Sequence, residues 1–305
     1  MTAAVITAPP EDDGLHPGIS DNSYHADRES LSSSGARRLL STCPAKFHHE
    51  QSQPPKPKAV YDFGHLVHHE VLGEGAELVI LVPEVHGVKA DGKPSEKPTA
   101  TTMWKDAEAE ARSRGAVPVH VADYLVARAM REQVYAHPIA RKLLEHGYPE
   151  LSGYWHDRAT GIRLRYRPDF LAELPGGRIV CVDYKSAADA SPGHFAKASA
   201  DYGYFQQDPW YREGLIANDI TDDPAFVFIA QEKEPPYLVS VLQHQADDVQ
   251  RGRDLNRIAV DRYAHCVGTG EWPGYGDGTH IIRMPSWFAA QHQARVSALT
   301  PLVAA

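Results

Sequence analysis

The chain has 305 residues, 42% of them hydrophobic, which is enough to bury a substantial core within one large domain. No stretch is long and apolar enough to cross a membrane, and the first ten residues lack the basic and apolar regions of a secretory signal, so we expect a cytoplasmic protein. The formal net charge of -9 argues against a broad cationic surface for nucleic acid.

The placement of cysteines and charges narrows the choice further. The three cysteines, Cys43, Cys181 and Cys266, lie far apart and provide no disulfide framework. Part of the negative charge lies in a Pro-, Ala- and Asp-rich leader at residues 1–22, which we expect to be disordered. Basic residues gather elsewhere, at positions 37, 38, 46, 56, 58, 89, 93, 97, 163, 165 and 167.

The first half of the chain is predicted to be mainly helical. Apolar spacing indicates helices at residues 34–50, 60–72, 104–114 and 120–146, with a strand at 77–82, a linker at 53–58 and a polar loop at 83–103. Gly64 and His68 lie one turn apart on the second helix, where glycine permits close approach and histidine can bind a metal. A lone helical histidine is more often structural, and His65 and His69 flank this one.

Three predicted strands in the middle of the chain carry the most informative residues. They lie at 150–157, 161–171 and 178–184, and a Pro-Gly-Gly turn joins the last two into a hairpin. Asp183 and Lys185 alternate along a strand and so share a face, while Pro168 predicts that the preceding strand bends or frays beside Asp169. The hairpin therefore brings together two carboxylates and an ammonium group, which can build a Mg²⁺ site for phosphodiester hydrolysis.

Simpler interpretations of the same residues stay open. Asp169 can cap a turn, and an exposed ion pair between Asp183 and Lys185 would contribute only about 0–1 kcal/mol. Residues Arg163, Arg165 and Arg167 alternate on one strand face beside the carboxylates, where they either bind DNA or form a solvated surface.

The last third of the chain continues the alternation of helices and strands. Ser191 and Pro192 begin a helix at 192–201, and the next helix places Gln207 and Tyr211 one turn apart on one face. Because proline disrupts a helix interior, Pro209 requires this helix to start near Asp208 or to have a distorted first turn. Strands at 226–231 and 237–243, a helix at 246–265, and a helix or tail at 286–305 complete the chain.

Taken in order, these elements resemble the PD-(D/E)XK nuclease superfamily, and specifically phage and prophage exonucleases of the exodeoxyribonuclease VIII type. The resemblance spans about residues 23–245. It implies an α/β (α+β) fold with a restriction-endonuclease-like core, in which helices flank a mixed central sheet, and one exonuclease domain at residues 23–285. The motifs that carry it are Leu31-Ser32-Ser33-Ser34, Cys43-Pro44-Ala45-Lys46-Phe47, Gly64-x-x-x-His68, Glu150, Gly161 to Asp169, Asp183-Tyr184-Lys185 and Gln207-x-x-x-Tyr211.

The resemblance also implies a metal centre. Asp169 and Asp183 would bind the ion, with His68 and the main-chain carbonyl of Tyr184 as further ligands. Oxygen ligands suit Mg²⁺ or Mn²⁺, and a histidine tilts the preference slightly toward Mn²⁺.

The remaining motif residues receive supporting roles by the same resemblance. Lys185 would orient the attacking water and help to deprotonate it. Gln207 and Tyr211 would position DNA or support the site, and Glu150 would act from outside the ligand shell. Iron–sulfur relatives are disfavoured because such a cluster needs four ligands and the chain has three cysteines.

The function that follows is a Mg²⁺-dependent exonuclease that resects linear duplex DNA ends for phage-type homologous recombination. The resemblance adds a homo-oligomeric ring and a single-strand annealing protein as partner. Two alternatives stay open: an endonuclease or single-strand nuclease with the same site, and a non-catalytic protein of nuclease-like fold that binds DNA or another protein.

Overall fold

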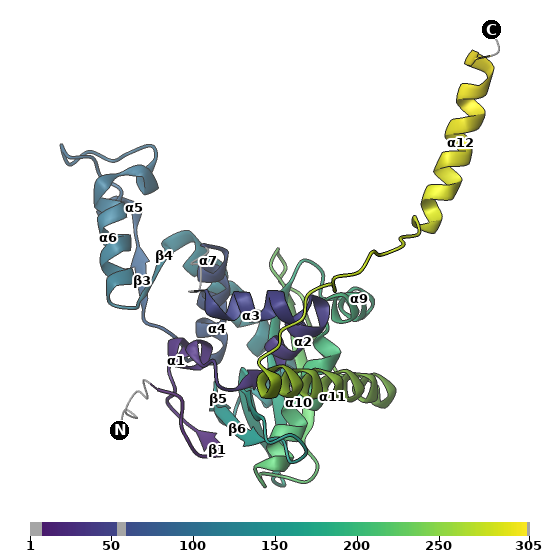
Figure 1. Cartoon of the computed structure of the whole chain (residues 1–305). Coiled ribbons are helices and arrows are strands. Elements are labelled where there is room, and N and C mark those ends of the chain that lie inside the picture. The colour runs from purple at the N-terminus through teal and green to yellow at the C-terminus, as the bar shows by residue number, and fades with distance from the viewer. Residues whose placement is uncertain (1–7, 54–58, 304–305) are drawn as a thin grey trace. The chain divides into compact units, whose positions relative to one another are not determined.

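The computed structural model describes residues 8–53 and 59–303. The chain divides into two compact units, Met1–Trp272 and Pro273–Ala305 (Figure 1). The nuclease domain at residues 23–285 stays a prediction. The second unit contains one helix, α12 (Ser286–Val303), among its described residues. None of the described helices is both long and apolar enough to span a membrane.

A five-stranded mixed sheet forms the centre of the first unit. Its strand order is β11 (Val239–Leu242), β10 (Ala225–Glu232), β9 (Arg178–Ala187), β8 (Phe170–Leu174) and β5 (Gly147–Pro149). β9 and β10 run parallel, and the other pairs are antiparallel. The two parallel strands are nearly continuous apolar runs because both of their faces are covered.

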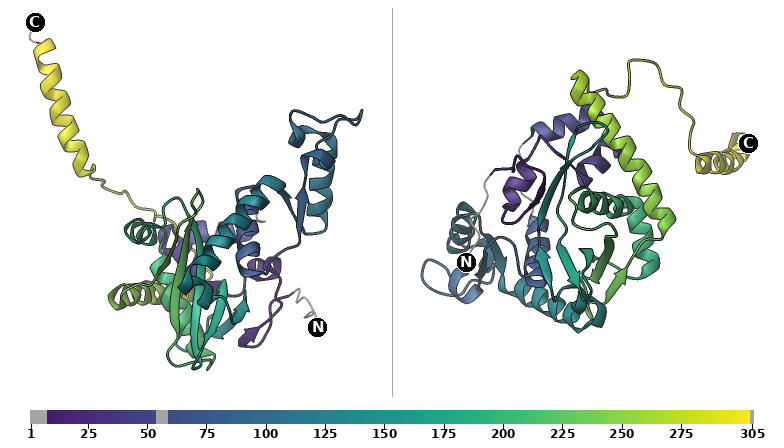
Figure 2. Two further views of the ribbon diagram at one scale, coloured as in Figure 1. Left: turned by 180° about the vertical axis from the view of Figure 1, so that it is seen from behind. Right: turned by 90° about the horizontal axis from the view of Figure 1, so that it is seen from below.

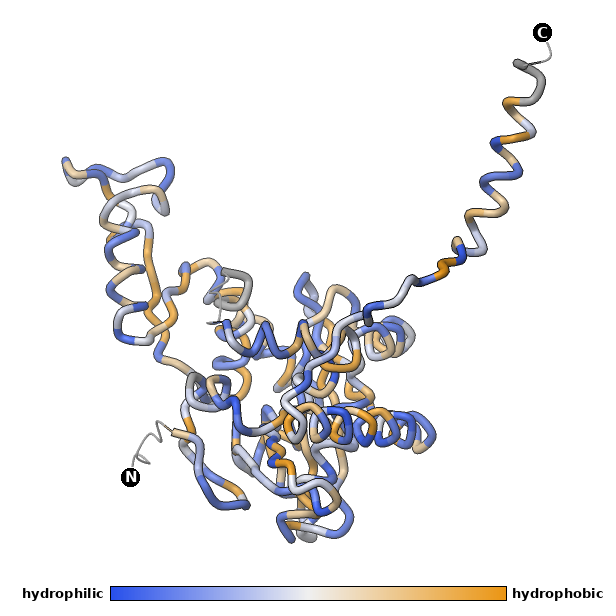
Figure 3. Tube along the Cα trace, viewed as in Figure 1, coloured by the Kyte–Doolittle hydropathy of each residue, from blue (hydrophilic) through white to orange (hydrophobic). Residues whose placement is uncertain are grey.

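Helices cover both faces of this sheet (Figure 2). Val180, Val182 and Tyr184 of β9 belong to a core that includes α4 (Ala59–Leu72), α7 (Val121–Ala136) and α8 (Pro138–Leu143). Ile179 and Cys181 belong to the opposite core, with α2 (Ser33–Ser41), α9 (Pro192–Tyr202), α10 (Tyr204–Ala217) and α11 (Ala246–Thr269). Figure 3 shows largely hydrophilic residues along α11, as expected for an outer helix. The predicted mixed α/β fold with flanking helices is confirmed.

Two smaller sheets complete the first unit. One has the order β1 (Gly14–His16), β6 (Ser152–His156), β7 (Arg163–Tyr166) and β2 (Leu31–Ser32). The other pairs β3 (Leu78–Leu81) with β4 (Val117–His120) in parallel, beside α6 (Thr102–Ser113). The remaining helices are α1 (Asp21–Ala26), α3 (Pro44–Ser52), the short α5 (Pro83–His86) and a 3₁₀ turn at Pro98–Ala100.

Proline explains three differences from the predicted elements. The helix expected at 34–50 is two helices, α2 and α3, and Pro44 is the first residue of the second. The helix expected at 120–146 is likewise two helices, α7 and α8, and Pro138 is the first residue of the second. The strand β4, which ends just before α7, is a separate difference, because no strand was predicted there. The strand expected at 161–171 is interrupted at Pro168, so that β7 and β8 lie in different sheets.

The predicted disordered leader is wrong for its second half. β1 pairs with β6, and the Asp13 carboxylate lies 2.9 Å from Nδ1 of His156. Two other predictions need qualification: the loop at 83–103 contains α5 and the 3₁₀ turn, and residues 54–58 of the linker at 53–58 lie outside the described residues, as do residues 1–7 of the leader.

Gly214 of α10 gives a test of the packing of this helix against β7. A Cβ atom at this position would lie 2.5 Å from the ring of Tyr166, which is fully buried. Gly214→Ala should therefore lower the free energy of unfolding by roughly 1–3 kcal/mol, measured by urea denaturation. Gly268→Ala is the matched control, since a Cβ there meets no atom within 4 Å and helix propensity favours alanine. Equal effects at the two glycines would contradict the packing described here.

Candidate active site

A cavity of about 580 Å³ opens where the main sheet, α1, α2, α4 and α10 meet. Most of the predicted site residues line it, although they come from distant parts of the sequence. They are His68, Glu150, Arg167, Asp169, Asp183, Lys185, Gln207 and Tyr211.

The β8–β9 pairing places the two aspartates. Phe170 lies opposite Val182, so Asp169, just before β8, reaches the neighbourhood of Tyr184. The main-chain N–H of Tyr184 donates a hydrogen bond of 2.7 Å to Oδ2 of Asp169. The predicted hairpin is thus present between β8 and β9, and together with the break at Pro168 it brings Asp169 to the strand that carries Asp183.

Asp183 is buried, with 1% of its surface exposed, and each of its oxygens has a partner. The Lys185 ammonium forms an ion pair with Oδ2, and Nε2 of Gln207 donates a hydrogen bond to Oδ1. Burial lowers the pKa of Lys185, but the Asp183 and Asp169 carboxylates outweigh it and hold the pKa above its usual value. The interpretation of Asp183 and Lys185 as an exposed surface pair is therefore wrong.

Asp169 carries an unusual charge balance. Burial and the nearby Asp183 carboxylate raise its pKa to about 7, against the opposing effects of Lys185 and the Tyr184 N–H. Two carboxylates that share a buried site resist simultaneous ionisation, which is the cause of such a shift. A positive ion between them would remove this cost.

His68 approaches the carboxylates from α4. Its Nδ1 lies 3.9 Å from Oδ2 of Asp169, and its ring packs edge-on against Tyr184 with 5.4 Å between ring centroids. Burial and the Lys185 charge lower the pKa of His68, which favours the neutral imidazole that metals bind.

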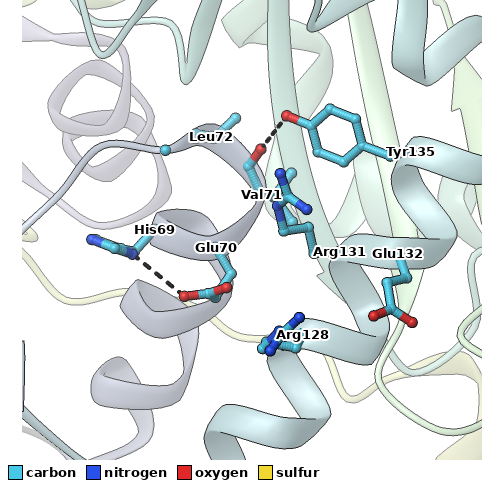
Figure 4. A pocket seen from close by; sticks show the side chains of 9 residues that line it. His69, Glu70, Val71, Leu72, Arg128, Arg131, Glu132 and Tyr135 are labelled. Atoms are coloured by element: carbon cyan, nitrogen blue, oxygen red, sulfur yellow. Dashed lines mark hydrogen bonds and ion pairs between the residues drawn. The ribbon is translucent and has the colours of Figure 1, made fainter. Parts of the chain in front are cut away.

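The next histidine of α4, His69, lines a separate cavity of about 400 Å³ (Figure 4), whereas His68 lines the cavity of the site. His69 points into that cavity, where its Nδ1 lies 3.7 Å from Oε1 of Glu70. The Tyr135 hydroxyl closes one side by donating to the Val71 carbonyl at 2.9 Å. Consecutive histidines of α4 thus line different cavities.

Glu150 is held in a conformation that few non-glycine residues adopt. Its φ is 46°, and its Oε2 lies 4.0 Å from Nη1 of Arg167. Burial raises its pKa, with Arg167 opposing. Glu150 lines the cavity, and its role outside the ligand shell stays a prediction.

The interpretation of the three arginines as a solvated strand face is wrong for two of them, whereas their alternative role in supporting the site stays a prediction. Arg165 and Arg167 are only 5% and 8% exposed, and both guanidinium groups lie over the ring of Tyr24. Arg165 lies 3.4 Å from Asp27 and donates to Ser30, while Arg163 stacks on Tyr154. Only Arg167 lines the cavity, so the alternation of arginines along the sequence mainly reflects attachment of α1 to the sheet.

Tyr211 supports the site through the main chain. Its hydroxyl donates to the Arg167 carbonyl at 2.9 Å, directly before Pro168 and Asp169. Of its two predicted roles, this contact favours support of the site over direct contact with DNA.

Several cavity residues received no role from the sequence. Asp21 falls in the predicted leader, yet it lines the cavity and lies 3.5 Å from Arg167. Ser33 begins α2, is buried, and has a hydroxyl without a hydrogen-bond partner. The Ser-Ser-Ser run after Leu31 was the available signal, since such residues begin helices.

The donor set fits a hard divalent cation that keeps part of its water shell. Among residues 8–53 and 59–303, no group of three or more His, Cys, Asp or Glu side chains is placed to hold a metal ion. Mg²⁺ needs no such group, because it commonly binds through one or two carboxylates and completes its shell with water or substrate phosphate. Asp169 and Asp183 could hold the ion in this way, and His68 and the Tyr184 carbonyl stay predicted ligands.

The raised pKa of Asp169 predicts how stability varies with pH. Because this pKa is about 7 in the folded protein, against 3.8 ordinarily, the folded form holds the proton more tightly. Its stabilising effect is complete below about pH 4 and is lost as the pH rises through about 7. In EDTA, Asp169→Asn should gain roughly 2–4 kcal/mol over the wild type between pH 4 and 8, measured by urea denaturation. Asp222 is exposed, so the free energy of unfolding of Asp222→Asn should vary with pH in the same way as that of the wild type. The same pH dependence in Asp169→Asn would contradict the raised pKa of Asp169.

Comparison with known proteins agrees with this architecture. A solved structure from Eubacterium rectale, described as a "putative exonuclease", is 13% identical, has a TM-score of 0.53, and the match covers 88% of this chain and 95% of that one. At this identity the likeness concerns the fold. None of the curated proteins compared with the sequence matches it. Residues 32–285 match the family model described as "PDDEXK-like domain of unknown function (DUF3799)". The chain therefore belongs to this PDDEXK-like family.

Proposed function

We propose that this protein is a divalent-metal-dependent DNA exonuclease that hydrolyses phosphodiester bonds at the ends of linear duplexes. One observation carries the proposal: the buried Asp183 is held by Lys185 and Gln207, beside Asp169, in a cavity open to solvent. A protein that only binds DNA has no need to place a buried carboxylate beside a second, partly buried one at this cost. This favours chemistry over the non-catalytic alternative.

The reaction sets a demanding requirement. Phosphodiester hydrolysis is so slow in water that a nuclease must lower the barrier by on the order of 20 kcal/mol, chiefly by electrostatics and positioning. A bound Mg²⁺ or Mn²⁺ would supply charge for the phosphate and lower the pKa of water. Asp169 and Asp183 are the residues that would hold it.

The chain's own residues define the remaining roles. The raised pKa of Lys185 favours its protonated form, so it balances the carboxylates and can donate to a phosphate or water oxygen. Gln207 fixes the orientation of the Asp183 carboxylate, and Tyr211 fixes the segment before Asp169. His68 faces Asp169 as a neutral base or ligand.

The cavity lining carries charges of both signs. Arg37, Arg167 and Lys185 contribute cationic groups, and these are opposed by five carboxylates, those of Asp21, Glu74, Glu150, Asp169 and Asp183. A polyanion would therefore need the added positive charge of the bound divalent ion. Local charge governs contact with the backbone of a nucleic acid.

Family membership and sequence motifs supply the finer part of the proposal. The fold shared with the Eubacterium rectale protein, whose description includes the word exonuclease, favours cutting from ends. The resemblance to exodeoxyribonuclease VIII-type enzymes supports phage-type recombination in the cytoplasm of the host cell, a homo-oligomer and a single-strand annealing partner. An endonuclease or single-strand nuclease with the same site is the second candidate.

Removal of one carboxylate tests the chemistry. Asp183→Asn should lower Mg²⁺-dependent degradation of linear duplex DNA at least roughly a hundredfold. The reason is that the divalent ion, which would stabilise charge at the phosphate, loses one of the carboxylates that would hold it. Asp189→Asn, an exposed carboxylate outside the cavity lining, is the matched control and should keep full activity. Retention of wild-type activity by Asp183→Asn would eliminate this site as the catalytic centre.

The form of the DNA tests the mode of cutting. End-labelled linear duplex and covalently closed circular DNA of the same sequence are incubated with Mg²⁺ or Mn²⁺, and products are resolved by electrophoresis. We expect mononucleotides or short products from the linear form and no change in the closed circle. Linearisation of the circle would favour the endonuclease, and binding without any cleavage would favour the non-catalytic alternative.

A further inference from the structure

The helix that carries Gln207 contains a proline in its interior. α10 begins at Tyr204, so Pro209 is its sixth residue and lies two positions after Gln207. Neither arrangement predicted for Pro209, a start near Asp208 or placement within a distorted first turn, is present. Proline has no N–H to donate to the Phe205 carbonyl, and its ring crowds that carbonyl. The turn containing Gln207 therefore lacks part of its own helical support.

Helix α11 supplies support at this turn. A Cβ atom on Gly252 would lie 2.3 Å from the Phe205 carbonyl oxygen and 2.9 Å from Cγ of Pro209, so only glycine allows the two helices to approach here. One turn later, the side-chain amide of Asn256 donates a hydrogen bond of 2.9 Å to the Gln206 carbonyl. Asn256 is 3% exposed, so this bond is shielded from water.

The two parts of α10 have different anchors. After Pro209, Nε1 of Trp210 donates to the Arg165 carbonyl at 2.9 Å, and the Tyr211 hydroxyl donates to the Arg167 carbonyl at 2.9 Å. These contacts fix the later part of the helix to the strand side. The turn before Pro209 instead packs on α11 through Gly252 and Asn256.

The side chain of Gln207 makes the position of this turn important for the site. Its Nε2 donates to Asp183, while its Oε1 is buried without a hydrogen-bond partner. The amide of Gln207 has two side-chain partners, Asp183 and the Tyr211 hydroxyl, and a displacement of the main chain at this turn would remove Gln207 from Asp183.

We infer that Asn256 is a positioning residue: by holding the Gln206 carbonyl it keeps the proline-interrupted turn of α10 in place, so that Gln207 stays bonded to Asp183. The catalytic consequence rests on the proposed nuclease function, whereas the effect on Gln207 does not. Gly252 acts with Asn256 by allowing α11 to reach this turn.

The test uses Asn256→Asp, which keeps the shape but replaces the amide donor by an oxygen that repels the Gln206 carbonyl. Asn256→Ala removes the donor without adding charge and serves if the first variant does not fold. Asn218→Asp is the matched control, because the Asn218 amide donates to the Tyr166 hydroxyl at 3.2 Å just after the end of α10. Thermal unfolding, kcat and KM on linear DNA, and the side-chain amide NMR signal of Gln207 are measured for each full-length variant.

We expect the Asn256 variants to shift the Gln207 signal and to lower kcat roughly ten- to a hundredfold with KM nearly unchanged. Asn218→Asp should leave both unchanged even where its melting temperature falls equally. In a Gln207→Ala background, the Asn256 substitution should cost almost nothing further in kcat, because both act through one contact.

An unchanged Gln207 signal in the Asn256 variants would overturn the inference. It would also be overturned if the Asn256 substitution lowered kcat in the Gln207→Ala background by the same factor as in the wild type. If the wild type cuts no DNA, the proposed function fails, and the Gln207 signal alone still decides whether Asn256 positions that side chain.

Discussion

The hydrogen bond from the Tyr184 N–H to Asp169 joins the two parts of the site, and much of the architecture serves to make it possible. It requires the chain to leave one sheet at Tyr166, turn at Pro168 and enter the central sheet at Phe170. The pairing of Phe170 with Val182 then fixes which residue of β9 meets Asp169. A shift of one residue would turn Asp183 and Lys185 toward the other face of the sheet, where Val182 and Tyr184 pack beneath α4, α7 and α8.

Charge is the second constraint on this arrangement. Two carboxylates and one ammonium group lie close together, where burial disfavours their charged forms, so one negative charge among these three is left without compensation when all of them ionise. The raised pKa of Asp169 expresses this deficit in the metal-free protein. The neutral His68 and the buried amide of Gln207 add dipoles but no positive charge. The site is thus arranged for a cationic ligand, which explains why stability and metal binding should be linked.

Support for the site comes from elements that carry no chemistry. Tyr211 and Trp210 tie α10 to the segment before Asp169, and α11 packs on the turn that holds Gln207. The buried Arg165 and Arg167 tie α1 to the same region through Tyr24. Residues that look like a DNA-binding stripe in the sequence are therefore part of the scaffold, because burial, which local alternation does not reveal, decides their role.

The sequence by itself determined the strand that carries Asp183 and Lys185, the turn at Gly176 and Gly177, and the break at Pro168. Alternation along a strand and the restrictions of proline and glycine are local properties, and they were sufficient to place both carboxylates together. Tertiary structure decided that Asp21 lines the cavity, that Arg165 is buried, and that α10 continues through Pro209. These depend on contacts between residues far apart in the chain, such as Asn256 with Gln206, whose free energy no local pattern contains.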